Sequence, residues 1–224
     1  MKYKNVKEGI FLNRPNRFIA NVLIGGQEVV CHVKNTGRCR ELLGEGARVF
    51  LEESDNPERK TKYDLIAVFK GDVLYNIDSQ APNVVFGEYI TSFFKNVKLV
   101  KSECKYKNSR FDFYVEYENK KAFIEVKGVT LEKDGVMLFP DAPTQRGVKH
   151  VNELCDLVNQ GYEAYVVFII QADAGKYFTP NRQTHAEFGD ALKKAHDKGV
   201  KVLAFCCKTQ KDSLFIKKAL KVEL

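Results

Sequence analysis

The chain changes character near Ala81-Pro82, and this change constrains its fold more than any other feature. Before it, short apolar and β-branched runs alternate with polar turns, and Gly25-Gly26 is typical of a two-residue hairpin loop. After it, helical and strand-like patterns alternate. The sequence therefore predicts a small β-barrel over 1–80 and an α/β domain over 81–224. The expected barrel strands are Ile10-Phe11, Phe18 to Ile24, Gln27 to Val33, Ala47 to Leu51, Asp64 to Phe69 and Val73 to Tyr75.

The second part of the chain contains two clear helix signals. Apolar residues from Val85 to Phe94 recur at three- and four-residue spacing, and Pro82 suits the first turn of that helix. Thr184 to Glu187 is a capping box, which predicts the start of another helix. The other expected elements are strands over 97–106, 111–117 and 122–126, a long loop over 128–143, a helix over 144–160, and strands over 163–170 and 201–207.

The 224 residues are 44% hydrophobic and 29% charged, a composition typical of a folded globular protein. The longest purely apolar run, Ala164 to Ile170, is far shorter than the ~20 residues that span a membrane. Residues 1–5 lead into no apolar segment of the kind found in secretory signals. The six cysteines contain no C-x-x-C pair, which favours reduced thiols over a zinc site. We therefore expect a cytoplasmic protein without membrane association.

The chain is basic. Lys and Arg number 36 against 29 Asp and Glu, which gives a formal net charge of +7 at pH 7. A basic surplus favours nucleic acid or another polyanion as a partner, although many basic proteins bind neither.

The second and third expected strands of the α/β domain carry the residues with the most specific chemistry. Both alternate apolar and polar residues, so each has two different faces. If Asn119-Lys120 is a two-residue hairpin loop, Asp112 lies directly opposite Lys127. Asp112 and Glu125 are then diagonal neighbours on one face, ~7–8 Å apart at the backbone. A three-residue loop would place Asp112 on the other face unless a bulge corrected it.

Two carboxylates at that separation can converge on one cation. Mg²⁺ commonly uses one or two carboxylates, with waters and substrate phosphate completing its shell. Such a metal offsets charge on a phosphodiester and can activate a water, while a neighbouring lysine can hold that water or stabilise developing negative charge. Asp112 followed by Glu125-x-Lys127 resembles the pattern of the PD-(D/E)XK nucleases, whose core has the same order of helices and strands. This resemblance implies that Asp112, Glu125 and Lys127 are catalytic, that Asp112 and Glu125 bind Mg²⁺ or Mn²⁺, and that Glu88 on the preceding helix assists.

A simpler interpretation is that Asp112, Glu125 and Lys127 form a salt-bridge ladder on the surface. Glu-x-Lys alone is common by chance. The flanking apolar residues oppose the simpler interpretation, since they make both strands look central in the sheet, and charges on central strands need a partner, solvent or a metal. The flanking residues are Phe111, Phe113, Ile124 and Val126.

Two basic segments are candidates for contact with nucleic acid. Arg146, Lys149 and His150 share one helix face near a helix start, which suits a phosphate site, although an ordinary solvated basic face has the same pattern. In the barrel, a strand ends in a polar turn that would present arginines to phosphates, although a plain hairpin or helix cap explains the turn equally well. The candidates in this turn are Asn35, Thr36, Arg38 and Arg40.

Taken together, these segments resemble the sugar fermentation stimulation protein A family over nearly the full length of the chain. The resemblance implies an N-terminal OB-fold barrel, a nuclease-like α/β domain, and a bacterial or archaeal cytoplasmic protein that binds DNA without strong sequence preference. It also implies a regulatory link to sugar (maltose) metabolism. The segments that carry it are 35–38, 109–112, 125–131 and 139–144, followed by Arg146-Gly147 and Lys149-His150.

Two functions are compatible with the sequence. One is a metal-dependent nuclease acting on DNA, single-stranded or double-stranded, or on RNA. The other is a DNA-binding regulator that uses the same basic surface without cleavage, because fold alone does not fix function. Nothing in the sequence has the pattern of a helix-turn-helix or zinc finger, so we expect salt-dependent binding with little base preference.

Overall fold

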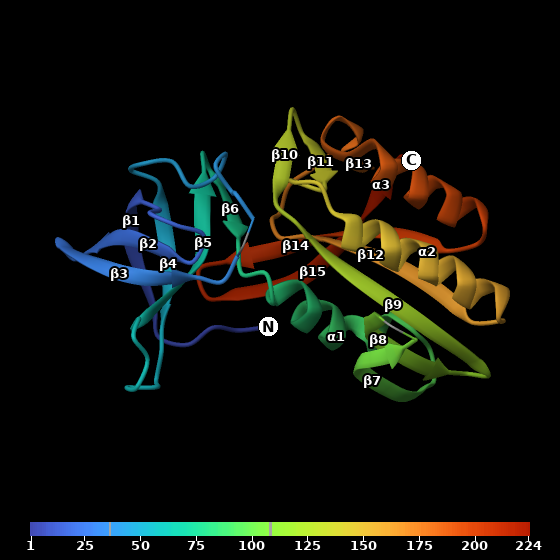
Figure 1. Ribbon diagram of the computed structural model, residues 1–224. Helices are drawn as coiled ribbons and strands as arrows, with labels where there is room; N and C mark the ends of the chain where they lie inside the picture. Colours follow the sequence, from blue (N-terminus) through green and yellow to red (C-terminus); the bar gives the residue numbers. More distant parts are fainter. Residues whose placement is uncertain (36, 108) are drawn as a thin grey trace.

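The computed structural model describes residues 1–35, 37–107 and 109–224. A β-barrel and an α/β domain lie next to each other (Figure 1). The barrel sheet has the order β3-β2-β1-β4-β5-β6, and β3 also pairs with β5, which closes it. The predicted barrel is therefore confirmed. Its strands are β1 (Val6–Asn13), β2 (Ile19–Ile24), β3 (Gln27–Val33), β4 (Arg48–Glu53), β5 (Tyr63–Lys70) and β6 (Val73–Asn76).

The α/β domain is built on one mixed sheet with the order β10-β11-β13-β15-β14-β12-β9-β8-β7. At its centre β9, β12 and β14 run parallel, and β12 is buried along almost its whole length. Its elements are α1 (Ala81–Phe93), β7 (Val97–Tyr106), β8 (Ser109–Tyr117), β9 (Lys120–Val129), β10 (Leu131–Lys133), β11 (Val136–Phe139), α2 (Gln145–Asn159), β12 (Glu163–Ile170), β13 (Tyr177–Pro180), α3 (Arg182–Asp197), β14 (Lys201–Gln210) and β15 (Ser213–Val222).

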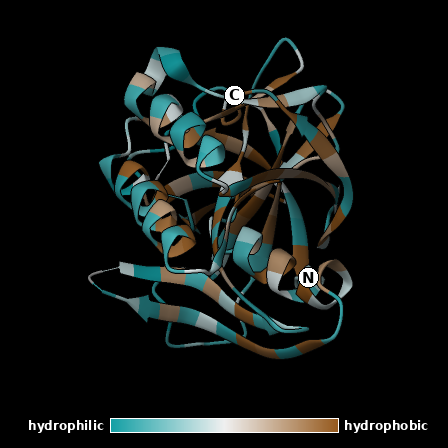
Figure 2. Cartoon of the chain, turned by 90° about the vertical axis from the view of Figure 1, so that its right-hand side faces the viewer, coloured by the Kyte–Doolittle hydropathy of each residue, from teal (hydrophilic) through white to brown (hydrophobic). Residues whose placement is uncertain are grey.

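Helices cover both faces of this sheet. On one face α1 packs Val85, Phe86 and Ile90 into a core shared with β8, β9 and β12. On the other face α2 and α3 contribute Leu154 and Leu192, among others, to a core that continues into the barrel. In Figure 2 the strands between the helices are predominantly brown, whereas the outward-facing helical turns are predominantly teal. A central parallel sheet covered on both faces explains the continuous apolar strands of the sequence.

The expected loop over 128–143 was wrong in part, because it contains the β10–β11 hairpin. Lys133 pairs with Val136, so Asp134-Gly135 is its two-residue loop, and both loop residues have positive φ. Asp-Gly is a strong hairpin signal, but each strand beside it is too short to show clear alternation. The short β13 was not predicted either; it pairs in parallel with β11 and β15.

The last helix has an extra first turn before the expected capping box, and a kink separates this turn from the rest. The α3 helix begins at Arg182, and the side chain of Asn181 caps it by accepting a hydrogen bond from the backbone N–H of Thr184. His185 has non-helical φ and ψ angles, so the helix is kinked at the position where the capping box predicts its first turn. Asn181 thus caps the first turn, and the longer part of α3 follows the kink beside the predicted capping box.

A buried polar network joins the barrel to the α/β domain. The Gln171 Nε2 donates to Asn76 Oδ1 at 2.8 Å and to the carbonyl of Asp78 at 2.9 Å. The Asn76 Nδ2 donates to the hydroxyl of Tyr3 at 2.8 Å, and the backbone N–H of Tyr3 donates to Asp212. All six cysteines are free thiols. In the described part of the chain, no helix is both long enough and apolar enough to cross a membrane.

A second polar cluster stabilises the barrel around the buried carboxylate of Asp64 on β5. Arg59 donates to both of its oxygens, at 2.6 and 2.8 Å, and His32 Nδ1 lies 3.0 Å from one of them. Burial raises the pKa of Asp64, but Arg59, His32 and Lys34 outweigh burial and hold the pKa at about 2. The ionised form of Asp64 is therefore the form that stabilises the fold.

We predict that Asp64→Asn lowers the free energy of unfolding at neutral pH by about 2 kcal/mol. Because the pKa in the folded protein is depressed, this contribution is complete above the unfolded pKa of about 4 and is lost as the pH falls towards 2. Urea unfolding of both proteins across this pH range measures the difference. Asp72→Asn, at an exposed position in the barrel, is the control. A difference that stays constant with pH would contradict the assignment.

Candidate active site

The strands β8 and β9 form a hairpin whose register differs from the predicted one. Tyr117 pairs with Lys120 and Phe113 with Ile124, so the loop is Glu118-Asn119 rather than Asn119-Lys120. Glu118 occupies the left-handed region with φ of 50°, as short hairpin loops require.

A one-residue error in the loop shifts the expected pairing by two residues. If the observed register is extended by one pair beyond Phe113 and Ile124, Asp112 lies across from Glu125 rather than from Lys127. This extrapolated register differs from the diagonal arrangement predicted from the sequence.

Asp112 sits where the two strands separate. The last ladder pair is Phe113 with Ile124, and beyond it the carboxylate oxygen Oδ2 of Asp112 accepts the backbone N–H of Val126 at 2.7 Å. The regular alternation of side chains along β8 is also interrupted at this residue. Phe111 packs against the ring of His150 on the α2 side of the sheet, whereas Phe113 packs against α1 on the opposite side. Asp112 thus replaces a backbone acceptor at the point where β8 leaves β9.

The second oxygen of Asp112 accepts a hydrogen bond from Asn83 Nδ2 of α1 at 2.8 Å. Burial raises the pKa of Asp112, and the negative charge of Glu125 raises it further. This rise in the pKa is offset only in part by Val126, Lys127 and Asn83. The Asp112 carboxylate is therefore short of compensating positive charge in the described structure.

Glu125 is almost completely buried on β9, with a side-chain exposure of 3%. Its Oε1 accepts from Lys127 Nζ and from His150 Nδ1, the latter at 2.6 Å. Burial raises the pKa of Glu125, but His150 and Lys127 outweigh burial and keep the pKa below its usual value. A surface salt-bridge ladder, the simpler interpretation of these residues, is incompatible with this burial.

The other oxygen of Glu125, Oε2, is buried and has no hydrogen-bond partner in the described part of the chain. A buried carboxylate oxygen without a partner is costly, because its lone pairs have lost water and gained nothing. Together with the partly compensated charge of Asp112, this oxygen makes the pair suited to a divalent cation, since Mg²⁺ and Mn²⁺ both prefer oxygen ligands. The described residues contain no cluster of three or more Asp, Glu, His or Cys side chains suited to a metal, so Asp112 and Glu125 would share the ion with water or substrate.

Glu88 does not join the pair. It is exposed on α1 and forms an ion pair with the amino group of Met1 at 2.5 Å. The residue of α1 that reaches Asp112 is Asn83. Five residues correspond to about 500° of helical rotation, so Asn83 and Glu88 point in different directions. The expectation that Glu88 assists at this site is therefore not supported by the geometry.

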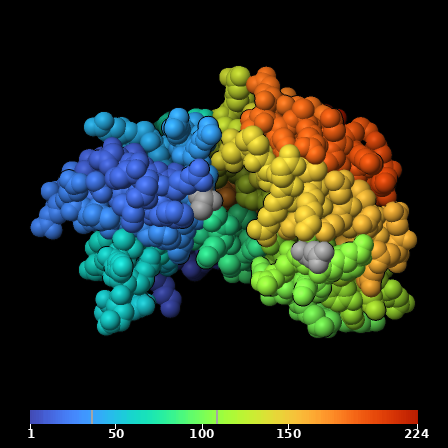
Figure 3. Space-filling view, in the orientation of Figure 1, coloured from blue at the N-terminus to red at the C-terminus, as the bar shows by residue number. Residues whose placement is uncertain are grey.

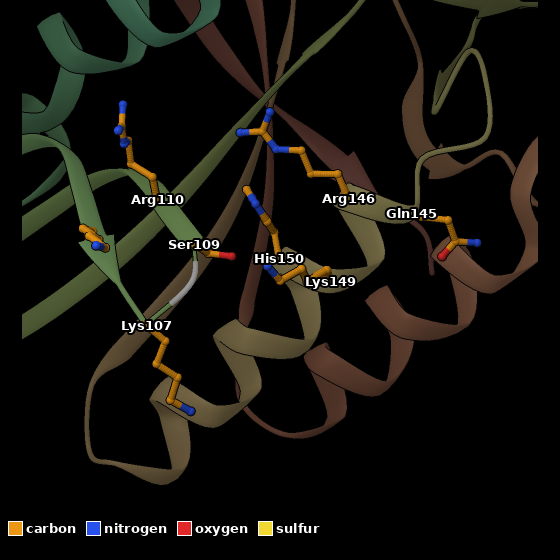
Figure 4. Close-up of a pocket in the computed structure, with 8 residues that line it drawn as sticks. Lys107, Ser109, Arg110, Gln145, Arg146, Lys149 and His150 are labelled. Carbon is orange, nitrogen blue, oxygen red and sulfur yellow. The ribbon is translucent and has the colours of Figure 1, made fainter.

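A basic cleft of about 840 Å³ lies between the β7–β8 hairpin and the start of α2 (Figure 4). Arg146 and Lys149, both exposed on α2, line it as the sequence suggested, together with the buried His150. His150 also touches Glu125, so it separates the cleft from the acidic pair. The hairpin contributes further cations that the sequence analysis missed, although alternate basic residues along one strand were visible there. These cations are Lys105, Lys107 and Arg110.

The polar turn of the barrel has a structural role. Asn35 accepts the backbone N–H of Gly37 and donates to the carbonyl of Ile77, so its amide is engaged on both sides. Arg14 donates to the carbonyls of Asn35, Gly37 and Arg38 and thereby fixes the turn. Thr36, a predicted contact residue, lies outside the described residues.

Arg38 and Arg40 are exposed on either side of the buried Cys39. The turn before them borders a second pocket of about 390 Å³, which also includes Gly128 to Leu131 and the loop at Asp141. Figure 3 shows this hollow between the blue barrel and the yellow segment of the α/β domain. The structure therefore brings Asn35 close to the end of β9, but it shows no contact between Arg38 or Arg40 and the acidic pair among the described residues.

Fold and site define a two-domain protein in which a closed β-barrel is joined to an α/β domain with a buried carboxylate pair beside a basic cleft. Two family models match this chain: "SfsA N-terminal OB domain" over residues 12–77 and "Sugar fermentation stimulation protein RE domain" over residues 80–213. The chain belongs to the sugar fermentation stimulation protein family, as the resemblance in its sequence predicted. The barrel is accordingly an OB domain.

Similar proteins agree with this assignment. A sugar fermentation stimulation protein homolog from Ruminiclostridium cellulolyticum is 55% identical over 226 residues, covering 100% of both chains. A homolog from Desulfitobacterium hafniense strain Y51 is 60% identical over 215 residues, covering 96% of this chain and 94% of that one. The solved structure of Pyrococcus furiosus SfsA in complex with Ca²⁺ has a TM-score of 0.89 at 25% identity, covering 100% of this chain and 98% of that one.

We predict that Asp112→Asn stabilises the metal-free protein. The substitution removes a buried charge that is repelled by Glu125, so in EDTA the melting temperature should rise by roughly 2–4 °C, the shift that about 1 kcal/mol produces in a chain of this size. Differential scanning calorimetry measures the rise, and Asp197→Asn on the exposed side of α3 is the control.

The same comparison with Mn²⁺ in place of EDTA tests the pair as a cation site. The unmodified protein should gain stability from the ion, whereas the Asp112→Asn protein should gain little. Equal stabilisation of both proteins by Mn²⁺ would contradict the role of Asp112 as a ligand.

Proposed function

We propose that this protein binds nucleic acid and hydrolyses phosphodiester bonds at the Asp112–Glu125 pair with the help of Mg²⁺ or Mn²⁺. The observation that carries the proposal is the buried Oε2 of Glu125, which has no partner among the described residues, next to a second carboxylate whose charge is only partly compensated. The Ca²⁺ complex of the Pyrococcus furiosus relative supports it, because that protein has the same fold and binds a divalent ion. The pattern of Asp112, Glu125 and Lys127 is also that of the PD-(D/E)XK nucleases.

Each residue has a distinct part in this reaction. A bound divalent cation supplies positive charge at the phosphate and favours ionisation of water. Asp112 and Glu125 hold it, and His150 keeps Glu125 in place through the Nδ1–Oε1 hydrogen bond. Lys127, with a side-chain exposure of 21%, is accessible enough to orient the attacking water. The water oxygen forms a bond to phosphorus, the bond from phosphorus to the sugar oxygen breaks, and the departing oxygen takes up a proton.

The basic surface would hold the strand. Arg146 and Lys149 line the cleft beside His150, and Arg38 and Arg40 extend from the barrel. OB domains bind single strands through basic grooves and exposed aromatic rings, and Phe18 of this barrel is 55% exposed. We therefore propose DNA as the ligand, in single- or double-stranded form, with RNA as an alternative, in a cytoplasmic protein.

A second candidate function is DNA binding without cleavage, in a regulator linked to sugar (maltose) metabolism. The position of Glu88 favours it, because Glu88 is the acidic residue of α1 that the nuclease pattern would use and it lies away from the pair. Both functions require the basic surface, and only the first requires the acidic pair.

A cleavage assay separates the two. We expect Mg²⁺- or Mn²⁺-dependent cutting of labelled DNA or RNA, lost by about a hundredfold or more in Asp112→Asn and in Lys127→Ala, because each removes a group that acts at the reacting phosphate. Lys133→Ala, at an exposed position on β10, is the matched control and should cut normally. Absence of cutting on every substrate, with DNA still retarded in a gel, would favour the regulator.

Binding should be electrostatic under either function. We predict that Arg38→Gln weakens DNA binding in EDTA and reduces the slope of log K against log salt by about 1, the effect of one lost phosphate contact. Fluorescence anisotropy over a range of salt concentrations measures this slope. Lys60→Gln, in the exposed loop between β4 and β5, is the control, and an equal effect of both changes would argue against a specific role for Arg38.

A further inference from the structure

The basic cleft contains a buried hydroxyl without a partner. Ser109, the first residue of β8, is only 7% exposed, and its Oγ has no hydrogen-bond partner among the described residues. It nevertheless lines the cleft, and Figure 4 shows its oxygen on the side that faces α2. A hydroxyl can donate one hydrogen bond and accept two, so this one can bind a polar group that enters the cleft.

The charges around this hydroxyl indicate that the ligand is an anion. All five charged side chains at the cleft are cations, and no carboxylate belongs to the described residues that line it. Three of the cations are partly compensated from outside the cleft: Lys107 by Asp156, Arg110 by Glu103 and Lys149 by Glu153, at 3.2 to 3.8 Å.

The other two cations are Lys105 and Arg146. Neither has a carboxylate within 4 Å among the described residues. The cleft therefore carries an excess of about two positive charges at neutral pH from its lysines and arginines.

The start of α2 adds to this positive potential. Gln145 and Arg146, its first two residues, line the cleft. The cap residue Thr144 accepts the backbone N–H of Gly147 through its side-chain hydroxyl, and the first N–H groups of a helix have no partner within the helix. Helix N-termini attract anions because backbone N–H groups and the helix dipole act together.

We propose that this cleft binds the terminal phosphate of a nucleic-acid strand, with Ser109 Oγ, Arg146 and Lys149 as its contacts. A terminal phosphate carries about −1.5 to −2 charges at pH 7 and has three free oxygens, whereas an internal phosphodiester carries one charge. The charge excess of the cleft therefore matches a strand end better than an internal position.

The position of the cleft relates this site to the acidic pair. His150 borders the cleft, and its Nδ1 lies 2.6 Å from Glu125 Oε1, so only one imidazole ring separates the two sites. A terminal phosphate in the cleft and the first phosphodiester at Asp112 and Glu125 would belong to the same strand. This step rests on the proposed function: hydrolysis there would release the terminal nucleotide, and the protein would act on strand ends.

Binding can be tested without cleavage. Three short single-stranded DNA oligonucleotides of one sequence, labelled in the interior, carry a phosphate at the 5′ end, at the 3′ end, or at neither end. Fluorescence anisotropy in EDTA gives their affinities. We expect the protein to bind one of the phosphorylated forms about tenfold more tightly, the ratio that one charge-assisted hydrogen bond of about 1.5 kcal/mol produces. The preferred form also gives the polarity of the strand.

Two variants locate the preference. Ser109→Ala and Arg146→Gln should each abolish most of the preference for the phosphorylated strand. Ser109→Ala should also leave the affinity for the unphosphorylated strand within about twofold of that of the unmodified protein. Ser102→Ala and Lys101→Gln, at exposed positions on β7 outside the cleft, should keep it. Melting temperatures of all four variants show that each is folded.

Equal affinity for all three oligonucleotides, or a preference that survives both Ser109→Ala and Arg146→Gln, would overturn the inference. Failure of the terminal-phosphate site and failure of the proposed nuclease function give different results. A protein that prefers phosphorylated ends but cuts nothing would retain the phosphate site and lose the nuclease.

Discussion

The hydrogen bond from the backbone N–H of Val126 to the carboxylate of Asp112 determines the geometry of the whole site. It takes the place of a ladder bond, so the β8–β9 pairing ends at Phe113 and Ile124 and the strands separate there. Without that separation, Phe111 and Phe113 would lie on the same face, and no opening would exist between the strands for a carboxylate pair. The central strand β9 tolerates the loss because its other edge remains paired with β12 along its length.

The site also shows how an unfavourable arrangement survives inside a folded protein. Glu125 is buried and has one oxygen without a partner, and Asp112 is repelled by it. Asp112 faces Asn83 of α1 and Glu125 faces His150 of α2, so each carboxylate lies at the edge of an apolar core. Such local strain typically persists where a function requires it, and here the surrounding aromatic packing on both faces of the sheet provides the stability that offsets it.

Much of the fold could be predicted from the sequence because most strands and helices are long and strongly patterned. The barrel strands, α1 and the buried β12 follow directly from alternation, helical spacing and continuous apolar runs. The hairpin loop was misplaced by one residue, since Asn119 is the only typical turn residue among Glu118, Asn119 and Lys120, and it can occupy either position of a two-residue loop. The sequence identified Asp112, Glu125 and Lys127, but it could not show that Asn83 rather than Glu88 reaches Asp112. Within one helix, the direction of a side chain depends on how the helix packs on its sheet.

The polar network at the junction of the domains has a consequence for how a ligand could be recognised. Tyr3, Asn76 and Gln171 bond to one another out of contact with solvent, and Tyr75 forms a bridge with Ala172 across the same junction. Opening a hinge here would expose several buried amide groups at once, which is costly. The barrel and the α/β domain therefore behave as a single rigid template. A partner bound across both domains would have to bend to the shape of the protein. Selectivity would then depend on how easily the partner bends, and not on closure of the protein around it.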